Sequence, residues 1–247
     1  MTDFPEMPGF LDRRVGKSPT LAAPYGQFAK PLIFTFTMLN TYLICPHQMY
    51  RRYVKKDLQF VETPEMKWGN EVHTAMEHRM GGKPLPEKMR HWESIAAPIA
   101  ARKPVTEQQL AITINGKPTN YWGKDVFFRG KNDITLVNAK ANAALLFDWK
   151  TGKVREDPFE LATNAMLVQA HKPNLETIQG RFVWLKDSVI GAEHDVSDTR
   201  GTWAKVNNLA EEIKDCQATN QWPKKKGPLC AWCNVFDCEN NTNPKKP

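Results

Sequence analysis

The stretch Asn132–Lys150, NDITLVNAKANAALLFDWK, contains two apolar runs separated by small and polar residues. This pattern is typical of two antiparallel strands joined by a turn. If Lys140 and Ala141 lie at the centre of the turn, Asp133 falls directly opposite Asp148, and opposed residues have Cβ atoms about 4.5–5.5 Å apart. The hairpin therefore predicts two carboxylates that face each other across a sheet.

The side chains of this hairpin should divide between two faces, because successive residues of a strand point to opposite sides. Lys150 then shares a charged face with Asp148. The opposite, apolar face receives Phe147, Trp149, Ile134 and Leu136. Facing carboxylates repel each other unless a cation compensates, and hard oxygen ligands suit a divalent ion. The pattern favours metal-assisted phosphodiester hydrolysis; the alternative is a hairpin of solvated charges in another register, without a metal.

The whole chain has 247 residues, 41% of them hydrophobic, which can supply one continuous core. Its formal net charge of +7 favours a polyanionic partner. No basic segment at the start leads into an apolar core, and no window approaches about 18 apolar residues. We therefore expect a soluble protein without a membrane partner, located in the cytoplasm, or in the host cytoplasm if a phage encodes it.

Proline and glycine divide the chain into three expected parts. Residues 1–34 predict an extended arm, residues 35–240 a single domain and residues 241–247 a flexible basic tail. Helices are expected over residues 35–53 with a break near Pro46, and over residues 63–81, 87–101, 158–170 and about 203–213. Strands are expected at QQLAITIN, DVFFRG, NDITLV, ALLFDWK and GRFVWLK. This order predicts an α/β (α+β) fold, with a central mixed sheet of about four or five strands flanked by helices.

The hairpin motifs resemble a known family. GKNDITLV followed by LLFDWKTGK is similar to the PD-(D/E)XK nuclease superfamily, in its RecB-like branch with a C-terminal iron-sulfur cysteine cluster, as in CRISPR-associated RecB-like and AddB-type nuclease domains. WGNEVHTAME resembles the family helix that presents a metal-binding histidine, here His73. The resemblance covers roughly residues 35–238 and implies a restriction-endonuclease-like core.

The resemblance also implies a metal-dependent deoxyribonuclease. His73 and the two facing aspartates would hold one or two Mg²⁺ or Mn²⁺ ions, with the backbone carbonyl of Trp149 as a further ligand. The two aspartates and Lys150 would be catalytic, with Lys150 positioning the attacking water and offsetting charge on the phosphate. Glu107, at the start of the first strand, is either an additional acid of this site or a solvated charge at the strand edge.

One helix departs from the family pattern. The family usually carries Gln-x-x-x-Tyr after its Asp-x-Lys strand, whereas PFELATNAMLVQA has Glu160 and Asn164 at those positions. Gln169 is present, but no tyrosine follows it four residues later. Those family residues help to hold the substrate strand. The departure therefore leaves open a second hypothesis, a catalytically weak or inactive nuclease-like protein that binds DNA without cutting it.

Four of the five cysteines form a second candidate site. PLCAWCNVFDC spaces Cys230, Cys233 and Cys238 as metal ligands are commonly spaced, and clustered cysteines in a reducing compartment more often bind metal than form disulfides. TMLNTYLICPHQMY resembles the opening motif of the branch, which implies Cys45 as a fourth thiolate and a 4Fe-4S cluster that fastens the two chain ends. Zinc remains the alternative for four thiolates. Cys216 has no counterpart and is expected to be a packed thiol.

Basic and aromatic residues alternate after Pro46: Tyr50, Arg51, Arg52, Tyr53, Lys55 and Lys56. They can grip phosphates and stack on the bases of a single strand, or form an ordinary solvated helix face. The expected partner is DNA, as single strands or duplex ends. The resemblance favours an exonuclease in recombination, repair or phage DNA processing, while digestion polarity and oligomeric state are not predicted.

Overall fold

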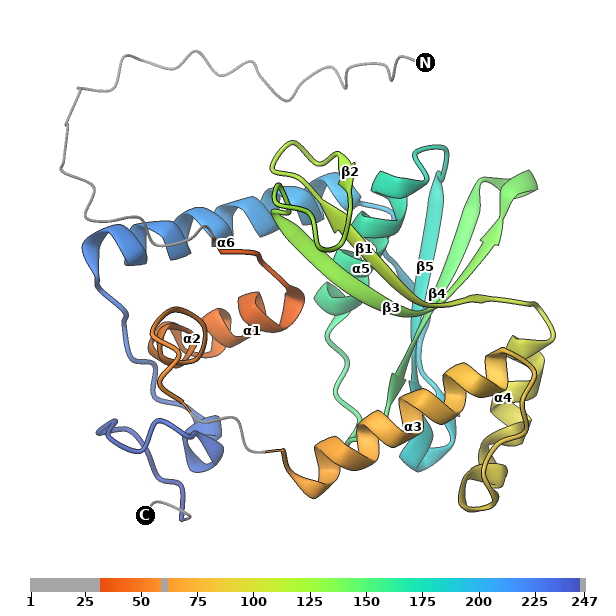
Figure 1. The fold of residues 1–247 in the computed structure, drawn as a ribbon, viewed down its shortest axis with the longest axis horizontal. Helices are drawn as coiled ribbons and strands as arrows, with labels where there is room; N and C mark the ends of the chain where they lie inside the picture. Colours follow the sequence, from red (N-terminus) through yellow and green to blue (C-terminus); the bar gives the residue numbers. More distant parts are fainter. Residues whose placement is uncertain (1–31, 59–61, 245–247) are drawn as a thin grey trace. The chain divides into compact units, whose positions relative to one another are not determined.

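A computed structural model describes residues 32–58 and 62–244 of the chain (Figure 1). The arm expected over residues 1–34 lies outside the described residues up to Pro31, and so does the end of the expected basic tail, residues 245–247. Within the arm, Phe34 is described: it is buried, and its main chain pairs with Phe127 and Arg129. No helix in the described part of the chain is both long and apolar enough to cross a membrane.

A mixed sheet forms the centre of the described chain. Its strands are β1 Val105–Ile112, β2 Pro118–Thr119, β3 Phe128–Asn138, β4 Ala143–Lys150, β5 Thr177–Trp184, β6 Val189–Ile190 and β7 His194–Asp195. The order is β2-β1-β3-β4-β5-β6, with β7 also paired to β5. The β4–β5 pair is parallel and the other pairs are antiparallel. The expected mixed α/β architecture is confirmed, but the sheet has seven strands because three two-residue strands, too short to show a hydrophobic period, join its edges.

Helices precede and follow the strands. The α-helices are α1 Phe36–Ile44, α2 Pro46–Met49, α3 Pro64–Met80, α4 Glu93–Ala100, α5 Pro158–His171 and α6 Thr199–Thr219. Shorter turns are a π-helix at Tyr50–Val54 and 3-10 helices at Glu87–Trp92, Ala139–Ala141, Leu185–Asp187 and Pro228–Trp232. Thr63 caps α3, since its hydroxyl accepts a hydrogen bond from the N–H of Met66 at 3.3 Å.

The hairpin has the predicted register. Ile134 pairs with Phe147 and Asn138 pairs with Ala143, so the same register continued by one residue sets Asp133 opposite Asp148. The turn is a short 3-10 helix, closed by a hydrogen bond from the N–H of Ala141 to the Asn138 side chain. The fold therefore brings the two aspartates to the end of the hairpin away from its turn.

Helices cover both faces of the sheet (Figure 1). The face that carries Phe147 and Trp149 packs on α3 and α4, as the alternation predicts. The other face is not simply charged: Ala144 and Leu146, which alternate with them, are buried in a core with residues of α5 and α6. A parallel pair with helices on both sides needs apolar residues on both faces. Asp148 is consequently a buried charge at the end of an apolar face.

Two segments expected as separate strands are joined. The end of DVFFRG, Phe128–Gly130, and all of NDITLV belong to one strand, β3, because Asn132 continues the ladder by pairing with Gln108 of β1. A glycine followed by polar residues is typical of a turn, but here Gly130 lies against Leu167 of α5, where a Cβ atom would come within 2.9 Å of the leucine side chain. The close approach of α5 therefore explains this glycine within a strand.

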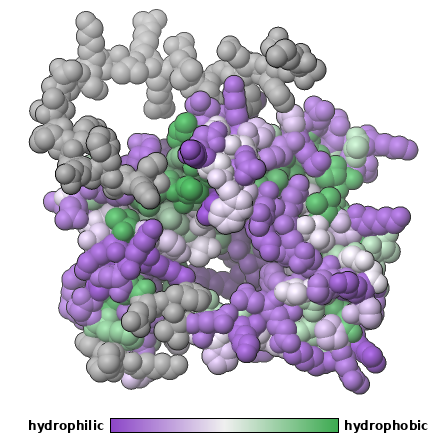
Figure 2. All heavy atoms as spheres, viewed as in Figure 1, coloured by the Kyte–Doolittle hydropathy of each residue, from purple (hydrophilic) through white to green (hydrophobic). Residues whose placement is uncertain are grey.

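The surface seen in Figure 2 is mostly hydrophilic, with a hollow near its centre between the α1–α2 part and the sheet. Near the C-terminus, Asn241, the first residue of the expected tail, is hydrogen-bonded to the segment before it. Its side chain donates hydrogen bonds to the carbonyls of Cys233 and Val235, both at 2.9 Å. Residues 241–243 are therefore part of the cysteine-rich segment.

Candidate metal centre

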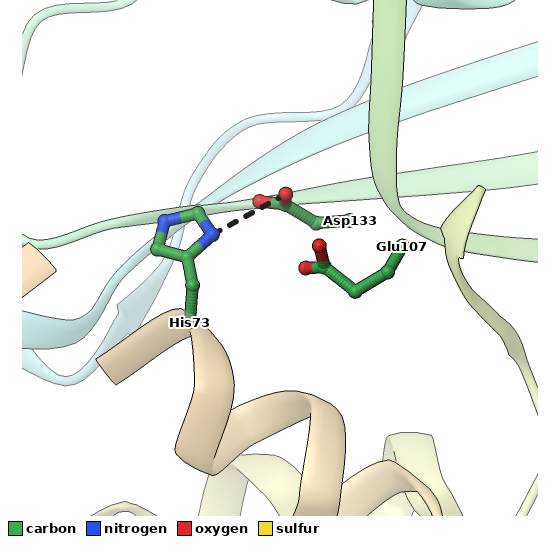
Figure 3. Close-up of side chains that lie close together, drawn as sticks. All are labelled: His73, Glu107 and Asp133. Atoms are coloured by element: carbon green, nitrogen blue, oxygen red, sulfur yellow. Dashed lines mark ion pairs between the residues drawn. The ribbon is translucent and has the colours of Figure 1, made fainter. Parts of the chain in front are cut away.

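Three side chains from separate elements lie close together and form the candidate metal centre. His73 extends from the middle of α3, Glu107 from β1 and Asp133 from β3, and they point toward one another in Figure 3. One potential ligand atom from each lies within 4.8 Å of the other two. Nδ1 of His73 is 3.3 Å from Oδ1 of Asp133. Burial alone would lower the pKa of His73, but the hydrogen bond and negative charge of Asp133 outweigh it and raise the pKa.

The second oxygen of Asp133 is held by the main chain. The N–H of Trp149 donates a hydrogen bond to Oδ2 at 2.9 Å. This fixes the carboxylate and leaves Oδ1 directed toward His73. The backbone carbonyl of Trp149 as a metal ligand stays a prediction, while its indole lies in the core beside α3.

Glu107 occupies an unusual backbone conformation. Its φ is +51°, in the left-handed region, although it lies within a strand between Thr106 and Gln108, which pair regularly with β3. A non-glycine residue in this region costs about 1–2 kcal/mol. The carboxylate also forms an ion pair with Lys131. A solvated strand-edge charge would not need this conformation, so the geometry favours the alternative in which Glu107 is an additional acid of the site.

Asp148 is buried beside this group, with 8% of the residue exposed. Burial is the main cause and the charge of Asp133 the second cause of a pKa raised to about 7. Its Oδ2 lies 2.6 Å from Nζ of Lys150 but lacks a partner with hydrogen-bond geometry. A buried carboxylate oxygen in this state is a strong potential cation ligand.

Lys150 lies between two carboxylates. Nζ is 2.6 Å from Oδ2 of Asp148 and donates a hydrogen bond to Oε2 of Glu160 at 2.8 Å. Burial would lower the pKa of Lys150, but these two negative charges outweigh it and raise the pKa. The side chain is therefore an ammonium donor. Glu160 belongs to the first turn of α5, whose N-cap Asp157 accepts a hydrogen bond from the N–H of Phe159.

Two further residues lie around the site. Asn164, one turn after Glu160 on α5, lies near Gly130 of β3, where a Cβ atom would come 3.4 Å from its Oδ1. Gly69 of α3 lies near Thr151, whose Oγ1 would be 3.4 Å from an added Cβ atom. The small residue thus lets α3 approach the segment that follows β4.

The four predicted ligand cysteines line a second candidate site. Cys45, Cys230, Cys233 and Cys238 all line one hollow of about 230 Å³, formed by the segment between α1 and α2 and by the C-terminal segment. The N–H groups of Gly227 and Val235 donate to the sulfurs of Cys230 and Cys233 at 3.4 and 3.5 Å. Main-chain donors of this kind stabilise thiolates and tune a bound metal.

Charged and polar contacts hold the two cysteine-bearing segments together. The Arg51 guanidinium donates to Asp57 and also to both oxygens of Asp237, at 2.7 and 2.8 Å. Lys225 donates to the carbonyl of Leu43 at 3.0 Å. Cys216 lies elsewhere, on α6 against the core, with its sulfur 3.8 Å from the Tyr42 hydroxyl. Its expected role as a packed thiol is confirmed.

Several residues proposed for DNA contact are engaged within the protein. Tyr50 stacks on Trp222 with centroids 5.1 Å apart, and Tyr53 packs against the core. Lys55 forms an ion pair with Asp57 at 2.7 Å. Arg52 is exposed, 5.4 Å from the Tyr53 ring. These contacts leave Arg52 and the exposed Lys56 as the more accessible cations of the expected set; DNA binding by that set stays a prediction.

Comparison with known proteins bears on the fold. No family model matches this sequence, and no curated protein matches it. A solved structure described as "Crystal structure of SSO0001" is similar, with a TM-score of 0.50 and 16% sequence identity, over 84% of this chain and 86% of the other. At this identity the similarity speaks only to the fold.

Proposed function

We propose that this chain is a metal-dependent DNA nuclease of the PD-(D/E)XK superfamily, in the RecB-like branch, with a restriction-endonuclease-like core. One observation carries the proposal. The ligand atoms of His73, Glu107 and Asp133 lie within 4.8 Å of one another, beside a buried Asp148 and its Lys150 neighbour. The sequence resemblance implies Asp133, Asp148 and Lys150 through the GKNDITLV and FDWKTGK motifs and His73 through WGNEVHTAME, whereas it does not include Glu107.

The donors at this site fit a hard divalent cation. Carboxylates bind both Mg²⁺ and Mn²⁺. The imidazole of His73 favours Mn²⁺ of the two, because Mn²⁺ is a transition metal. His73, Glu107, Asp133 and Asp148 would hold the ion. The burial of the Asp148 carboxylate next to Asp133 and the strained backbone of Glu107 are two features that a bound cation would explain. When bound, the ion would supply a Lewis acid for phosphodiester hydrolysis.

The protein groups then have separate roles. Asp133, with Oδ2 held by the Trp149 N–H, keeps its other oxygen directed toward the ion site. Lys150, kept charged by Asp148 and Glu160, donates hydrogen bonds to the attacking water or to a phosphate oxygen and offsets developing negative charge. A protonated lysine acts here as a donor and not as a base.

The biological setting follows from the same residues. We place the protein in the cytoplasm, where reducing conditions would keep its cysteines free for metal binding. An exonuclease acting on DNA ends or single strands, in recombination, repair or phage DNA processing, fits the resemblance.

A 4Fe-4S cluster is the proposed occupant of the cysteine site. Four thiols line one hollow. The resemblance implies a 4Fe-4S cluster for them, and a single zinc ion is the alternative occupant of four thiolates. The cluster would be structural, because its ligands come from both ends of the described chain.

The second hypothesis, a weak or inactive nuclease-like DNA-binding protein, has one observation in its favour. Glu160 accepts a hydrogen bond from the Lys150 ammonium. Its carboxylate, in addition to those of Asp133 and Asp148, would lie near the position of an anionic substrate. Such a protein would bind DNA but would leave it intact.

A nuclease assay separates the two hypotheses. Wild-type protein, Asp148→Ala and Lys150→Ala would be incubated with single-stranded, duplex and flapped DNA, with Mn²⁺ or Mg²⁺ and with EDTA. We expect metal-dependent cutting by wild type and at least about a 100-fold loss in both variants. DNA that binds to wild type and stays intact under every metal condition would establish the second hypothesis instead.

The cysteine site has its own test. Anaerobically purified protein should be brown, with about four iron atoms per chain. Cys230→Ser should lose iron, whereas Cys216→Ser, a matched change on α6, should retain it. Colourless protein with one zinc ion per chain would replace the cluster with zinc.

A further inference from the structure

The loop between β2 and β3 exposes an aromatic group that neither candidate site uses. Trp122 has 71% of its surface exposed. Its ring meets that of Tyr121 edge to face, with centroids 5.0 Å apart and an interplanar angle of 83°. An exposed indole is a large apolar surface left in water, and surfaces of this kind commonly mark binding sites.

Arg129 of β3 holds the two rings in place. Its Cζ lies 4.8 Å from the Tyr121 centroid and 4.7 Å from the Trp122 centroid. Its Nη1 also donates to the carbonyl of Tyr121 at 3.2 Å. Among the ion pairs of the described residues, none involves Arg129. Its positive charge is therefore left without a carboxylate partner in that part of the chain.

Hydrogen bonds fix the loop that presents Trp122. The N–H of Trp122 donates to Oδ1 of Asn120 at 2.9 Å, and the N–H of Gly123 donates to the Asn120 carbonyl at 2.8 Å. The Thr119 hydroxyl donates to Asp125 at 2.7 Å. A Cβ atom at Gly123 would come within 2.8 Å of Asp125. The indole is thus preorganised, so a ligand would bind it with little loss of side-chain entropy.

We propose that Trp122, Tyr121 and Arg129 form a stacking platform for a base of single-stranded DNA, with Arg129 also binding the adjacent phosphate. Single-stranded binders combine aromatic rings with positive charge in this way, whereas neighbouring base pairs in a duplex cover the faces of its bases. Arg129 precedes Asp133 by four residues on β3, about 13 Å along a strand. The platform can therefore hold a strand a few nucleotides from the metal centre, so this inference rests on the proposed nuclease function and names its substrate as a single strand.

The test measures binding separately from cutting. Fluorescence anisotropy of a labelled oligothymidine would be recorded in EDTA with wild type, Trp122→Ala, Trp122→Phe and Trp232→Ala. Trp232 is the matched control, because 74% of its surface is exposed and it lies in the cysteine-rich segment. We expect Trp122→Ala to weaken binding about 5- to 100-fold, Trp122→Phe to retain most of the affinity, and Trp232→Ala to bind like wild type. Arg129→Gln should lower the slope of the logarithm of the binding constant against the logarithm of the salt concentration by the amount expected for about one phosphate contact.

The outcomes are distinguishable from failure of the nuclease proposal. Unchanged affinity in Trp122→Ala, or an equal loss in Trp232→Ala, would overturn the platform. If Trp122→Ala weakened the binding of blunt duplex DNA as much as the binding of the single strand, that result would also overturn the platform. If Trp122→Ala selectively loses oligothymidine and wild type cuts no DNA, the platform stands and the nuclease proposal fails.

Discussion

Glu160 of α5 accepts a hydrogen bond from Nζ of Lys150 at 2.8 Å, and so engages the ammonium that the proposed function assigns to a phosphate. The contact explains what the departure from Gln-x-x-x-Tyr does in the folded chain. A glutamine in this position could still hold Lys150 through its carbonyl oxygen, but without negative charge. If the proposed function holds, the carboxylate competes with an anionic substrate for the same donor.

The first prediction is that Glu160→Gln raises kcat/KM of DNA cleavage about 3- to 10-fold. Removing one carboxylate reduces repulsion of the phosphate and releases Lys150 to bind it. Cleavage would be compared by single-turnover kinetics, with Glu176→Gln as a control because Glu176 contacts Asn142 at the far end of the hairpin. A tenfold or greater decrease in Glu160→Gln would assign Glu160 a required role and contradict this interpretation.

A second prediction concerns the strained residue of β1. Glu107→Gly should stabilise metal-free protein by about 1 kcal/mol, because glycine adopts φ of +51° without the penalty of a side chain. The same change should weaken Mn²⁺ binding about 10-fold or more by removing a carboxylate. Urea unfolding in EDTA and isothermal titration with Mn²⁺ would measure the two effects. Unchanged metal affinity would exclude Glu107 from the site.

A third prediction follows from the buried carboxylate. Because the pKa of Asp148 is raised to about 7 by burial and by Asp133, the folded protein binds a proton there that the unfolded chain releases near pH 4. The contribution of Asp148 to the free energy of unfolding therefore falls by on the order of 2–4 kcal/mol as the pH rises from about 4 to about 7. Asp148→Asn should abolish this decrease, because the amide does not titrate.

The measurement is urea unfolding of metal-free protein at pH 5 and pH 8, comparing wild type with Asp148→Asn. We expect the variant to gain stability relative to wild type at pH 8 and little at pH 5. Lys150 keeps Glu160 as a counter-charge in the variant, so it is not left unpaired. A relative gain that is equal at both pH values would show that Asp148 is ionised throughout this range.

A fourth prediction concerns the attachment of the cysteine-rich segment. Hydrogen bonds from Arg51 lower the pKa of Asp57 to about 2 and also lower the pKa of Asp237. Such contacts are fully present above about pH 4 and are lost as the pH falls toward 2. Arg51→Gln should detach this segment and reduce iron content at least twofold at neutral pH. Arg52→Gln, next in sequence but exposed, is the control and should keep its iron.

The sequence by itself indicated the hairpin, because its apolar runs, polar turn and two-residue period are local properties of one stretch, while the choice between its possible registers was left to the folded sheet. The central mixed sheet and the α3 helix with its Thr63 cap follow from similar local patterns. The two-residue strands β2, β6 and β7 could not be predicted, since nothing in two residues distinguishes a strand from a loop.

Only the tertiary structure decided how distant residues combine. Glu107 joins His73 and Asp133 because β1 pairs with β3 and turns through a left-handed residue, which no composition or period reveals. Arg51, grouped by sequence with possible DNA contacts, instead binds Asp237 across 186 positions. Charged side chains pair with whatever the fold brings near them, so their roles depend on long-range contacts, whereas the strands that position them depend on local pattern.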